Sequence, residues 1–238
     1  GVMMIAEESG DFPKVTHAVT EGGLGFTYKW NMGWMNDTLA YMQTDPVYRS
    51  GMHNNMTFSM MYAYNEHYIL PISHDECVHG KKSLLDKMYG EYYQKFASEK
   101  AYLGYMFAHP GKKLLFMGCE IGQFIEWRYY EQIEWKLLQY ETHRGLYLFV
   151  KALLALYREQ PALWAQDDTW EGFEWINADD AAQSVFSMAR YGGGETVMAV
   201  INMTPVARFD YWLTAPKAGK YTLLLNSDEK LYGGEGSA

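Results

Sequence analysis

Apolar residues occur in short runs along the first part of the chain, and polar or charged residues end each run. Four runs predict buried strands: Val2–Ala6, Phe26–Trp30, Tyr68–Ser73 and Leu114–Met117. Three of them show little alternation, which is typical of parallel strands covered on both faces. Pro71 is unusual inside a central strand because proline donates no backbone hydrogen bond. We nevertheless expect the third run to be a strand, since the residues around Pro71 are strongly apolar.

Helical spacing of apolar residues follows in the segments between and after these runs. One stripe consists of Trp34, Met35, Leu39 and Met42; a second of Phe96, Leu103, Met106 and Phe107; and a third of Leu146, Phe149, Val150, Leu153, Leu156 and Tyr157. The sequence HPGKK ends the second stripe and Pro161 ends the third, as expected of helix stop signals. Strands that alternate with helices predict βαβ units, and therefore an α/β fold with a parallel sheet.

The pattern changes after about Leu163. Short strands are expected at Phe186–Arg190, Thr196–Asn202 and Tyr221–Asn226, with Gly192–Gly194 as a hairpin turn between the first two. Long helical patterns are absent from this stretch, so we predict a second, all-β domain of the sandwich type. The chain ends in the turn-like sequence LYGGEGSA, and we expect the sandwich to be incomplete.

Composition and charge narrow the classes of function. The 238 residues include 20 Tyr, 11 Phe and 8 Trp, which fit either a large aromatic core or a site that stacks on sugar rings. The formal net charge of −9 gives no general attraction to nucleic acid or anionic lipid. We therefore expect neither nucleic acid nor membrane as a partner, and no apolar window is long enough to predict a membrane span.

Cysteine usage and the absence of cofactor motifs point to a cytoplasmic protein without a bound metal or cofactor. Cys77 and Cys119 are the two cysteines, and neither lies in a Cys-x-x-Cys pair. Such sparse cysteine fits a reducing compartment, so we interpret both as reduced structural thiols. The N-terminus has no basic signal region, and neither zinc-ligand spacing nor a phosphate-binding glycine loop is present.

Acidic residues follow three of the four predicted strands. Glu7 and Glu8 follow the first, His74–Asp75–Glu76 the third and Glu120 the fourth. Chemistry in parallel α/β folds lies at these carboxyl ends. Paired carboxylates are what cleavage of a glycosidic bond requires, one to donate a proton and the other to attack or assist. The residues alone leave two interpretations open, a glycosidase-like site or acids in solvated loops.

Several long motifs resemble a known family. They are MIAEES, GLGFTYKWNMGWMNDTLAYM, DPVYR, LPISHDECVHGKKSLLDKM, PGKKLLFMGCEIGQ and EWINADD. Together they resemble bacterial 1,4-alpha-glucan (glycogen) branching enzymes of the α-amylase superfamily, from residue 3 to about residue 235. The resemblance implies that residues 1–160 are the C-terminal half of a (β/α)8 TIM barrel, strands 5–8. Residues 161–238 would then begin the C-terminal β-sandwich of that superfamily.

The resemblance also implies roles for individual residues. Glu7 matches the general acid/base glutamate, Asp75 the carboxylate that stabilises the transition state, and His74 a hydrogen-bond donor to sugar hydroxyls. The implied reaction cleaves an α-1,4 bond of a glucan and transfers the chain to a 6-hydroxyl, in the synthesis of glycogen. The implied partner is therefore α-1,4-glucan or glycogen.

One element of the family pattern is missing. The nucleophilic Asp of the family follows its fourth barrel strand, two residues after an Arg. Here the only Arg-x-Asp is Arg208-Phe209-Asp210, in the predicted sandwich. We therefore expect this chain by itself to be inactive, and its exposed half-barrel surface to favour self-association.

Other residues near the strand ends have two interpretations each. Trp30 and Trp34 are candidates for stacking on the glucan, with core packing as the alternative, and Glu76 is a candidate for substrate binding or for orienting its neighbours. For the function as a whole, two alternatives to a branching enzyme stay open: an amylase-like α-glucan hydrolase and a non-catalytic glucan-binding fragment. Ser73 and Glu8 replace residues typical of the hydrolases and so favour the branching enzyme.

Overall fold

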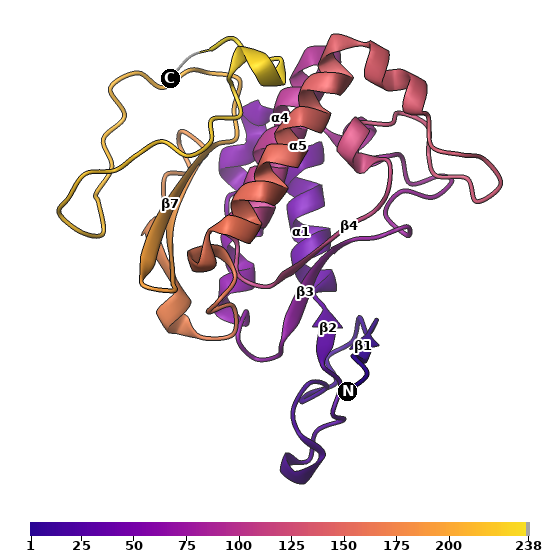
Figure 1. Cartoon of the computed structure of the whole chain (residues 1–238), viewed down its shortest axis with the longest axis vertical. Coiled ribbons are helices and arrows are strands. Elements are labelled where there is room, and N and C mark those ends of the chain that lie inside the picture. Colours follow the sequence, from indigo (N-terminus) through magenta and orange to yellow (C-terminus); the bar gives the residue numbers. More distant parts are fainter. Residues whose placement is uncertain (237–238) are drawn as a thin grey trace.

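The computed structural model describes residues 1–236, and its strands form two separate sheets (Figure 1). The strands are β1 (Ile5–Ala6), β2 (Tyr28–Trp30), β3 (Tyr68–Ile72), β4 (Lys112–Leu115), β5 (Phe173–Asn177), β6 (Val185–Gly192) and β7 (Glu195–Asn202). The α-helices are α1 (Met32–Gln43), α2 (Asn54–Thr57), α3 (Leu84–Lys87), α4 (Tyr92–Ala108) and α5 (Glu141–Glu159). Short 3-10 turns connect them, among them η2 (Pro46–Met52) and η4 (Cys119–Ile121).

The first sheet is parallel, with its strands in the order β1-β2-β3-β4. The four strands expected from the sequence are therefore confirmed in type and order, although three are shorter than predicted and the fourth is shifted. β1 has only two residues, because β2 offers pairing partners only for Ile5 and Ala6. β4 begins at Lys112, two residues before the predicted start, directly after Gly111. The φ of 104° at Gly111 is one that glycine adopts readily, and it turns the chain from α4 into the strand.

The prediction that these strands are covered on both faces holds only for β3. Four of its five residues are buried, whereas Ile5 is exposed and every residue of β4 is only partly buried. The reason is position in the sheet: β1 and β4 are its edges, and each has one neighbouring strand. An apolar run alone cannot show which strand will lie at an edge.

Pro71 lies in the central strand β3 without breaking the ladder. The backbone of Ile69 faces β2, since its carbonyl oxygen accepts from Asn31 N at 2.8 Å. Residue 71 faces the same side, but β2 pairs with β3 only as far as Trp30–Ile69. The missing N–H of Pro71 therefore points beyond the paired part of β2, where no bond is lost.

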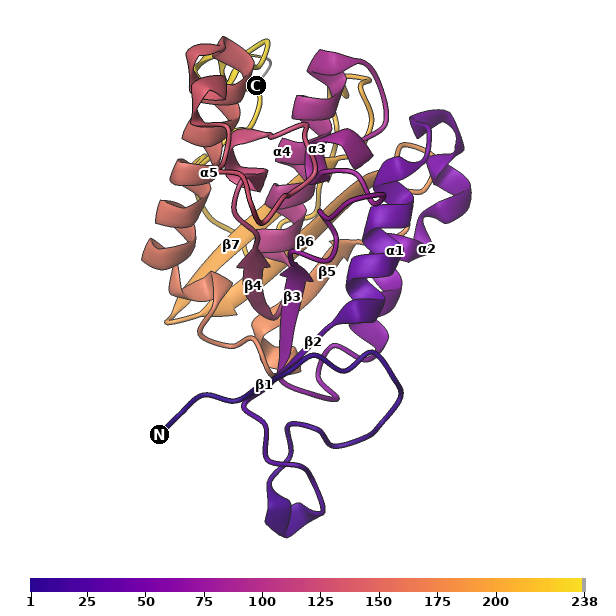
Figure 2. The ribbon, with the colours of Figure 1, turned by 90° about the vertical axis from the view of Figure 1, so that its right-hand side faces the viewer.

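Helices α1, α4 and α5 bury the stripes that the sequence predicts. In Figure 2, β3 and β4 lie side by side, with α1 toward one side and α5 toward the other. Fully buried members include Trp34 and Met42 on α1 and Leu103 on α4. The helices end where predicted, α4 at Ala108 before HPGKK and α5 at Glu159 before Pro161.

The second sheet is antiparallel, in the order β5-β6-β7. A two-residue turn joins β6 to β7 at the predicted glycines. Gly193 and Gly194 have φ values of 61° and 82°, and the pair Gly192–Glu195 closes the hairpin. Positive φ at both central residues is the type I′ geometry that matches strand twist.

One expectation for this region is wrong in the described residues: residues 221–226 form no strand. The sheet β5-β6-β7 is the β-structure of this region, and within residues 1–236 no second sheet packs on it, so the sandwich stays a prediction. The apolar residues Leu223 and Leu224 favour a strand in the sequence, but in the structure they are exposed and their segment pairs with no strand. Helix α4 covers β7 instead, which gives this sheet a helical layer as its neighbour.

One continuous apolar core joins both sheets. It includes Trp34, Leu70 and Leu103 from the first part of the chain and Phe186 and Met188 from β6. The boundary predicted at residues 160/161 marks a change of secondary structure, but the two parts share this core. Across the part of the chain that is described, no helix combines the length and apolar character needed to cross a membrane.

Candidate active site

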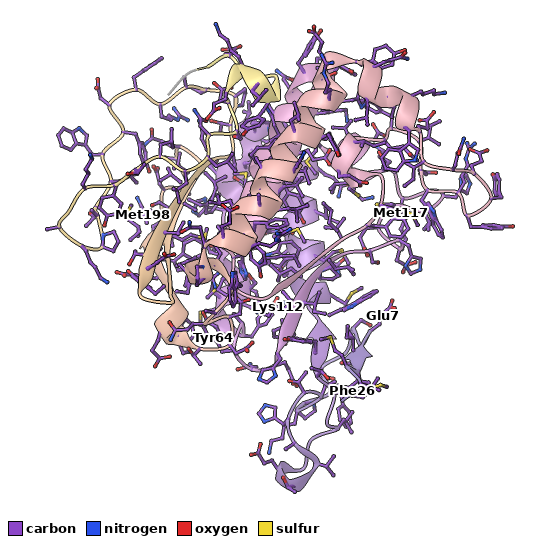
Figure 3. All side chains as sticks on the ribbon, in the orientation of Figure 1. Glu7, Phe26, Tyr64, Lys112, Met117 and Met198 are labelled. Carbon is purple, nitrogen blue, oxygen red and sulfur yellow. The ribbon has the colours of Figure 1, made fainter. Side chains whose placement is uncertain are left out.

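Glu7 directly follows β1 and is exposed at the margin of the structure. In the view of Figure 3 it lies beside β1, on the same side of the molecule as Met117, which follows β4. Within residues 1–236 its carboxylate makes no hydrogen bond or ion pair. Such a carboxylate is free to meet a ligand, as a proton donor must be.

The adjacent Glu8 is held by the neighbouring strand. Its Oε2 lies 2.5 Å from Nζ of Lys29 on β2, and its Oε1 accepts from Gly10 N at 2.5 Å. The hydrogen bond from Lys29 lowers the pKa of Glu8 below its ordinary value, and the bond from Gly10 adds to this effect. The charged carboxylate of Glu8 thus links the end of β1 to β2.

Glu76 at the end of β3 is also turned inward. Its Oε2 accepts from Ser73 N at 2.6 Å and from Ser73 Oγ at 2.7 Å, and the residue is 5% exposed. Ser73 Oγ in turn accepts from Asp75 N at 3.2 Å. The prediction that Glu76 binds substrate is corrected: a carboxylate buried against its own strand end positions Asp75 and does not reach a ligand.

His74 and Asp75, the two residues between Ser73 and Glu76, face outward. His74 is exposed, and its ring centroid lies 5.9 Å from that of Trp127 and 6.2 Å from that of Phe116. The partly buried Asp75 has Lys81 Nζ 3.6 Å from its Oδ2. The exposed surface at this strand end thus carries an imidazole and a carboxylate side by side, with aromatic rings behind the imidazole.

Buried Lys87 fixes the loop that follows. Its Nζ donates to the carbonyl oxygens of Glu76, Lys81 and Lys82, the last at 2.7 Å. Burial lowers the pKa of Lys87 below its ordinary value, while nearby thiol and carboxylate groups oppose that shift. Sequence reasoning missed Lys87 and Trp127, because neither belongs to a strand end and only the folded loops bring them there.

The two tryptophans of the predicted stacking platform differ. Trp30 ends β2 and is partly exposed. Trp34 is 0% exposed and stacks on Tyr102 of α4, with ring centroids 5.9 Å apart and an interplanar angle of 21°. The substrate-binding prediction for Trp34 is therefore wrong, since a side chain enclosed between α1 and α4 cannot contact a glucan.

Strand register describes how the two candidate catalytic carboxylates are placed. Ala6 pairs with Lys29, and Trp30 pairs with Ile69. Glu7, one residue after Ala6, thus lies at the level of Trp30 and Ile69, whereas Asp75 lies six positions after Ile69, beyond the end of β3. Both acids lie toward the carboxyl ends of the same parallel sheet, in strands separated by β2, but among the described residues no hydrogen bond joins them.

Other candidates for the site are ruled out by their location. Arg208-Phe209-Asp210 lies in the loop after β7, remote in sequence from every strand end of the parallel sheet. Among residues 1–236, no group of three or more His, Cys, Asp or Glu side chains is arranged to hold a metal ion.

Residues 175–238 match the family described as alpha amylase, C-terminal all-beta domain. The chain is 54% identical over 235 residues to a 1,4-alpha-glucan branching enzyme of Pseudomonas fluorescens. It is 52% identical over 238 residues to that of Pseudomonas aeruginosa and 51% identical over 239 residues to one of Clostridium perfringens. These matches cover 98% to 100% of this chain and 32% to 36% of the relatives, so the chain spans about a third of their length.

Two solved structures have a similar fold over most of this chain. The α-amylase from H. orenii superposes with a TM-score of 0.57 at 15% identity, over 85% of this chain and 43% of that structure. A structure of AmyP in complex with maltose gives a TM-score of 0.51 at 16% identity, over 76% of this chain and 40% of that one. The resemblance that the sequence motifs predict is confirmed.

Proposed function

Because the chain is homologous to bacterial 1,4-alpha-glucan branching enzymes over nearly its whole length, we propose that it forms part of the catalytic site of such an enzyme. The observation that carries this proposal is the arrangement at the strand ends. Glu7 and Asp75 are solvent-accessible there, while their neighbours Glu8 and Glu76 are bound to the protein. The reaction would cleave an α-1,4 bond of glucan or glycogen and transfer the chain to a 6-hydroxyl.

The half-barrel interpretation is part of this proposal. Four parallel strands in sequential order, with α-helices between β2 and β3 and between β3 and β4, are consistent with a segment of a (β/α)8 barrel. In a closed barrel, residues 1–160 would contribute strands 5–8, and residues 161–238 the start of the following β-domain.

Each residue has one task in this mechanism. Glu7 donates its proton to the leaving glycosidic oxygen and then takes a proton from the acceptor hydroxyl. Asp75 faces the sugar carbon as positive charge develops on it. His74 donates a hydrogen bond to a sugar hydroxyl, and the Trp127 and Phe116 rings behind it limit its motion.

Two positioning contacts prepare these groups. The ion pair between Glu8 and Lys29 fixes the backbone that carries Glu7. The buried Glu76 fixes Ser73, whose hydroxyl accepts from the backbone N–H of Asp75. Both contacts leave the exposed acids free for substrate, and we place this chemistry in the cytoplasm.

The test uses a full-length chimera in which this chain replaces the matching segment of the Pseudomonas fluorescens enzyme. The chimera is expected to branch amylose, which shifts and weakens the iodine complex. Glu7→Gln keeps the side-chain shape but removes the proton donor, so transfer should fall about 10²–10⁴-fold while glucan binding survives. Glu21→Gln, an exposed acid elsewhere in the chain, is the matched control and should change nothing.

His74 and Asp75 are compared in the same chimera. His74→Ala should cost less activity than Asp75→Asn, because a hydrogen bond to a hydroxyl contributes less than a charge facing an oxocarbenium-like centre. Near-normal turnover in Glu7→Gln, or an inactive parent chimera that still folds, would count against the proposal.

The alternatives give different products. A hydrolase shortens amylose and releases reducing ends without forming α-1,6 bonds, whereas a glucan-binding fragment leaves the substrate unchanged. The 238-residue chain alone is expected to leave the substrate unchanged, because no carboxylate in it takes the nucleophile role that retaining transfer needs. Accumulation of α-1,6 branches by the purified chain would show that this assignment of carboxylates is wrong.

A further inference from the structure

Two buried thiols lie next to the candidate active site. Cys77 comes two residues after Asp75, and Cys119 begins the η4 turn after β4. Both are free, they are 4% and 6% exposed, and their Sγ atoms are 3.8 Å apart. Bridged sulfurs lie about 2.05 Å apart, so a small approach of one strand end toward the other would bond them.

The surroundings shift the pKa values of the two thiols in opposite directions. The hydrogen bond from Cys119 lowers the pKa of Cys77, burial opposes this, and the charge of Lys87 supports it. The pKa of Cys119 is raised well above its ordinary value, first by its contact with Cys77 and then by burial. Cys77 is therefore the more nucleophilic sulfur, and Cys119 keeps its proton.

Three carboxyl groups raise the pKa values of this pair: Glu76 acts on Cys77, and Glu99 and Glu120 act on Cys119. Glu99 on α4 is 0% exposed and its two oxygens have no hydrogen-bond partner within the described residues. Burial raises the pKa of Glu99 well above its ordinary value, which disfavours a negative charge at this position. Lys87 is thus the cation that favours a thiolate here.

A shallow depression in the surface leads to both sulfurs. Its walls include Ser83, Leu84, Met117, Gln123, Ile125 and Trp127. Since each cysteine is more than nine-tenths buried, only a small reagent can reach them while the protein stays folded.

We propose that Cys77 and Cys119 form a redox site, which a hydroperoxide oxidises to an intramolecular disulfide. The Cys77 thiolate attacks one peroxide oxygen, the O–O bond breaks, and Cys77 becomes a sulfenic acid while water or an alcohol leaves. The Cys119 sulfur then attacks the Cys77 sulfur and displaces the hydroxyl, which leaves as water with the Cys119 proton. In sum, two thiols lose two electrons and two protons, and the peroxide gains them.

The disulfide would also move the neighbouring turn that carries His74 and Asp75. The carbonyl oxygen of Cys77 accepts from Trp127 N at 2.7 Å, and the Trp127 ring contacts His74. Drawing Cys77 toward Cys119 therefore shifts the turn that carries His74 and Asp75. A loss of glucan transfer on oxidation follows from this shift; that consequence, unlike the thiol chemistry, rests on the proposed function.

The thiol chemistry is tested on the purified, reduced 238-residue chain. It is treated with hydrogen peroxide, alkylated, digested and analysed by mass spectrometry. We expect a cross-linked peptide pair containing Cys77 and Cys119, formed within one chain and reversed by a thiol reductant. Oxidation to sulfinic acid without the cross-link, or a disulfide only between chains, would overturn the proposal.

Single-residue variants show which cysteine attacks the peroxide and which one then forms the disulfide. Cys119→Ser should stop at a sulfenic acid on Cys77 that a dimedone probe captures, whereas Cys77→Ser should react at least about tenfold more slowly. Equal rates in the two variants, with circular dichroism spectra like that of the parent, would contradict the assigned nucleophile. The cross-link in the parent chain needs no variant, so it decides the proposal even where a variant misfolds.

The effect on transfer is measured in the full-length chimera. Peroxide should lower branching in the parent chimera, reductant should restore it, and the Cys119→Ser chimera should not show the reversible loss. A cross-link without any change in branching would refute the coupling to Asp75 and leave the redox site intact. A chimera that is inactive from the start would count against the proposed function alone.

Discussion

Neighbouring acids at a strand end take opposite tasks in this protein. Glu8 and Glu76 are bound by Lys29 and Ser73, while Glu7 and Asp75 remain accessible. The difference is one of local partners, because all four acids lie beyond the strand ends and only Glu8 and Glu76 meet a donor that turns them toward the protein. Sequence position identified the set of acids, but only their partners show which of them can meet a ligand.

Glu66 is the residue that ties the long β1–β2 connection to the body of the protein. Its carboxylate accepts from Val15 N and Thr16 N, both at 2.8 Å, and from the Thr16 hydroxyl. Burial raises the pKa of Glu66, but the hydrogen bonds from Thr16 and Val15 outweigh it, and the pKa is lower than ordinary. The folded state therefore favours the charged form of Glu66.

We expect Glu66→Gln to lower the free energy of unfolding by about 1–3 kcal/mol, because an amide cannot accept from all three donors. The contribution has a defined pH dependence. Since the folded-state pKa is depressed, the stabilisation is present above the ordinary carboxyl pKa of about 4.3 and is lost as the pH falls through the lower, folded-state value. Urea unfolding of both proteins between neutral and acidic pH measures the difference.

Glu21→Gln serves as the control for Glu66, because Glu21 is an exposed acid on the same connection. Its effect should be small at every pH. A stability difference between Glu66→Gln and the parent that stays constant down to acidic pH would show that the charge of Glu66 is not what the fold uses.

At the scale of elements, α1 and α4 are joined by one aromatic contact. Trp34 on α1 stacks on Tyr102, and Thr38 Oγ1 lies 3.1 Å from the Tyr102 hydroxyl. Trp34→Ala should therefore destabilise the chain by about 3–5 kcal/mol, as large-to-small changes of buried aromatics do. Its glucan affinity, measured on protein that is still folded, should not change specifically.

Trp30→Ala is the matched comparison, since Trp30 is partly exposed at the end of β2. In the chimera it should weaken glucan binding, with a smaller loss of stability than Trp34→Ala. If Trp34→Ala proved stable but weakened binding, the assignment of Trp34 to the core would be wrong.

A buried ion pair connects β6 to the rest of the molecule. Arg190 Nη2 lies 2.6 Å from Asp167 Oδ1, with side chains 0% and 1% exposed, and Arg190 Nη1 donates to the Ala108 carbonyl at 2.9 Å. Lys112 on β4 binds the other oxygen of Asp167 at 2.8 Å. These contacts link the end of α4, the start of β4 and the second sheet.

Asp167→Asn removes the charge that both cations share. We expect a loss of about 3–5 kcal/mol of stability, because the Arg190 charge remains buried without its counter-ion. Asp168→Asn changes the adjacent, exposed residue and should have almost no effect. Thermal unfolding of the two variants measures this difference in stability. Equal melting temperatures would show that the ion pair between Asp167 and Arg190 does not stabilise the fold.

The whole molecule presents an apolar edge at β1. Val2, Met3 and Met4 are 87%, 61% and 54% exposed, and β1 pairs only with β2 among the described residues. Open edges with apolar side chains favour association. We therefore predict that the 238-residue chain alone forms dimers or larger species.

Sedimentation velocity over a range of concentrations measures this association. The double change Met4→Lys with Ile5→Lys should shift the chain toward the monomer, because charged side chains block edge pairing. Leu154→Lys, an equally exposed apolar position on α5, should leave the association unchanged. A monomeric parent chain at all concentrations would contradict the prediction.

Most elements of the fold follow from local sequence patterns. The stripes of α1, α4 and α5, the stop at Pro161 and the glycine hairpin before β7 are all observed. Each depends on helical periodicity or on the backbone freedom of one residue, and such properties act over a few positions. The motifs that contain Glu7 and Asp75 are likewise contiguous, so the resemblance to bacterial branching enzymes is visible in the sequence alone.

Tertiary structure decided what depends on contacts between distant segments. Residues 221–226 have the composition of a strand but find no partner, Trp34 has the character of a stacking platform but is enclosed by α4, and β4 is an edge. The contact between Cys77 and Cys119 belongs here too, since their thiols meet only because β3 and β4 pair. Burial and pairing arise from the packing of whole elements, and a local pattern of apolar residues specifies only that a surface will be covered, not by which segment.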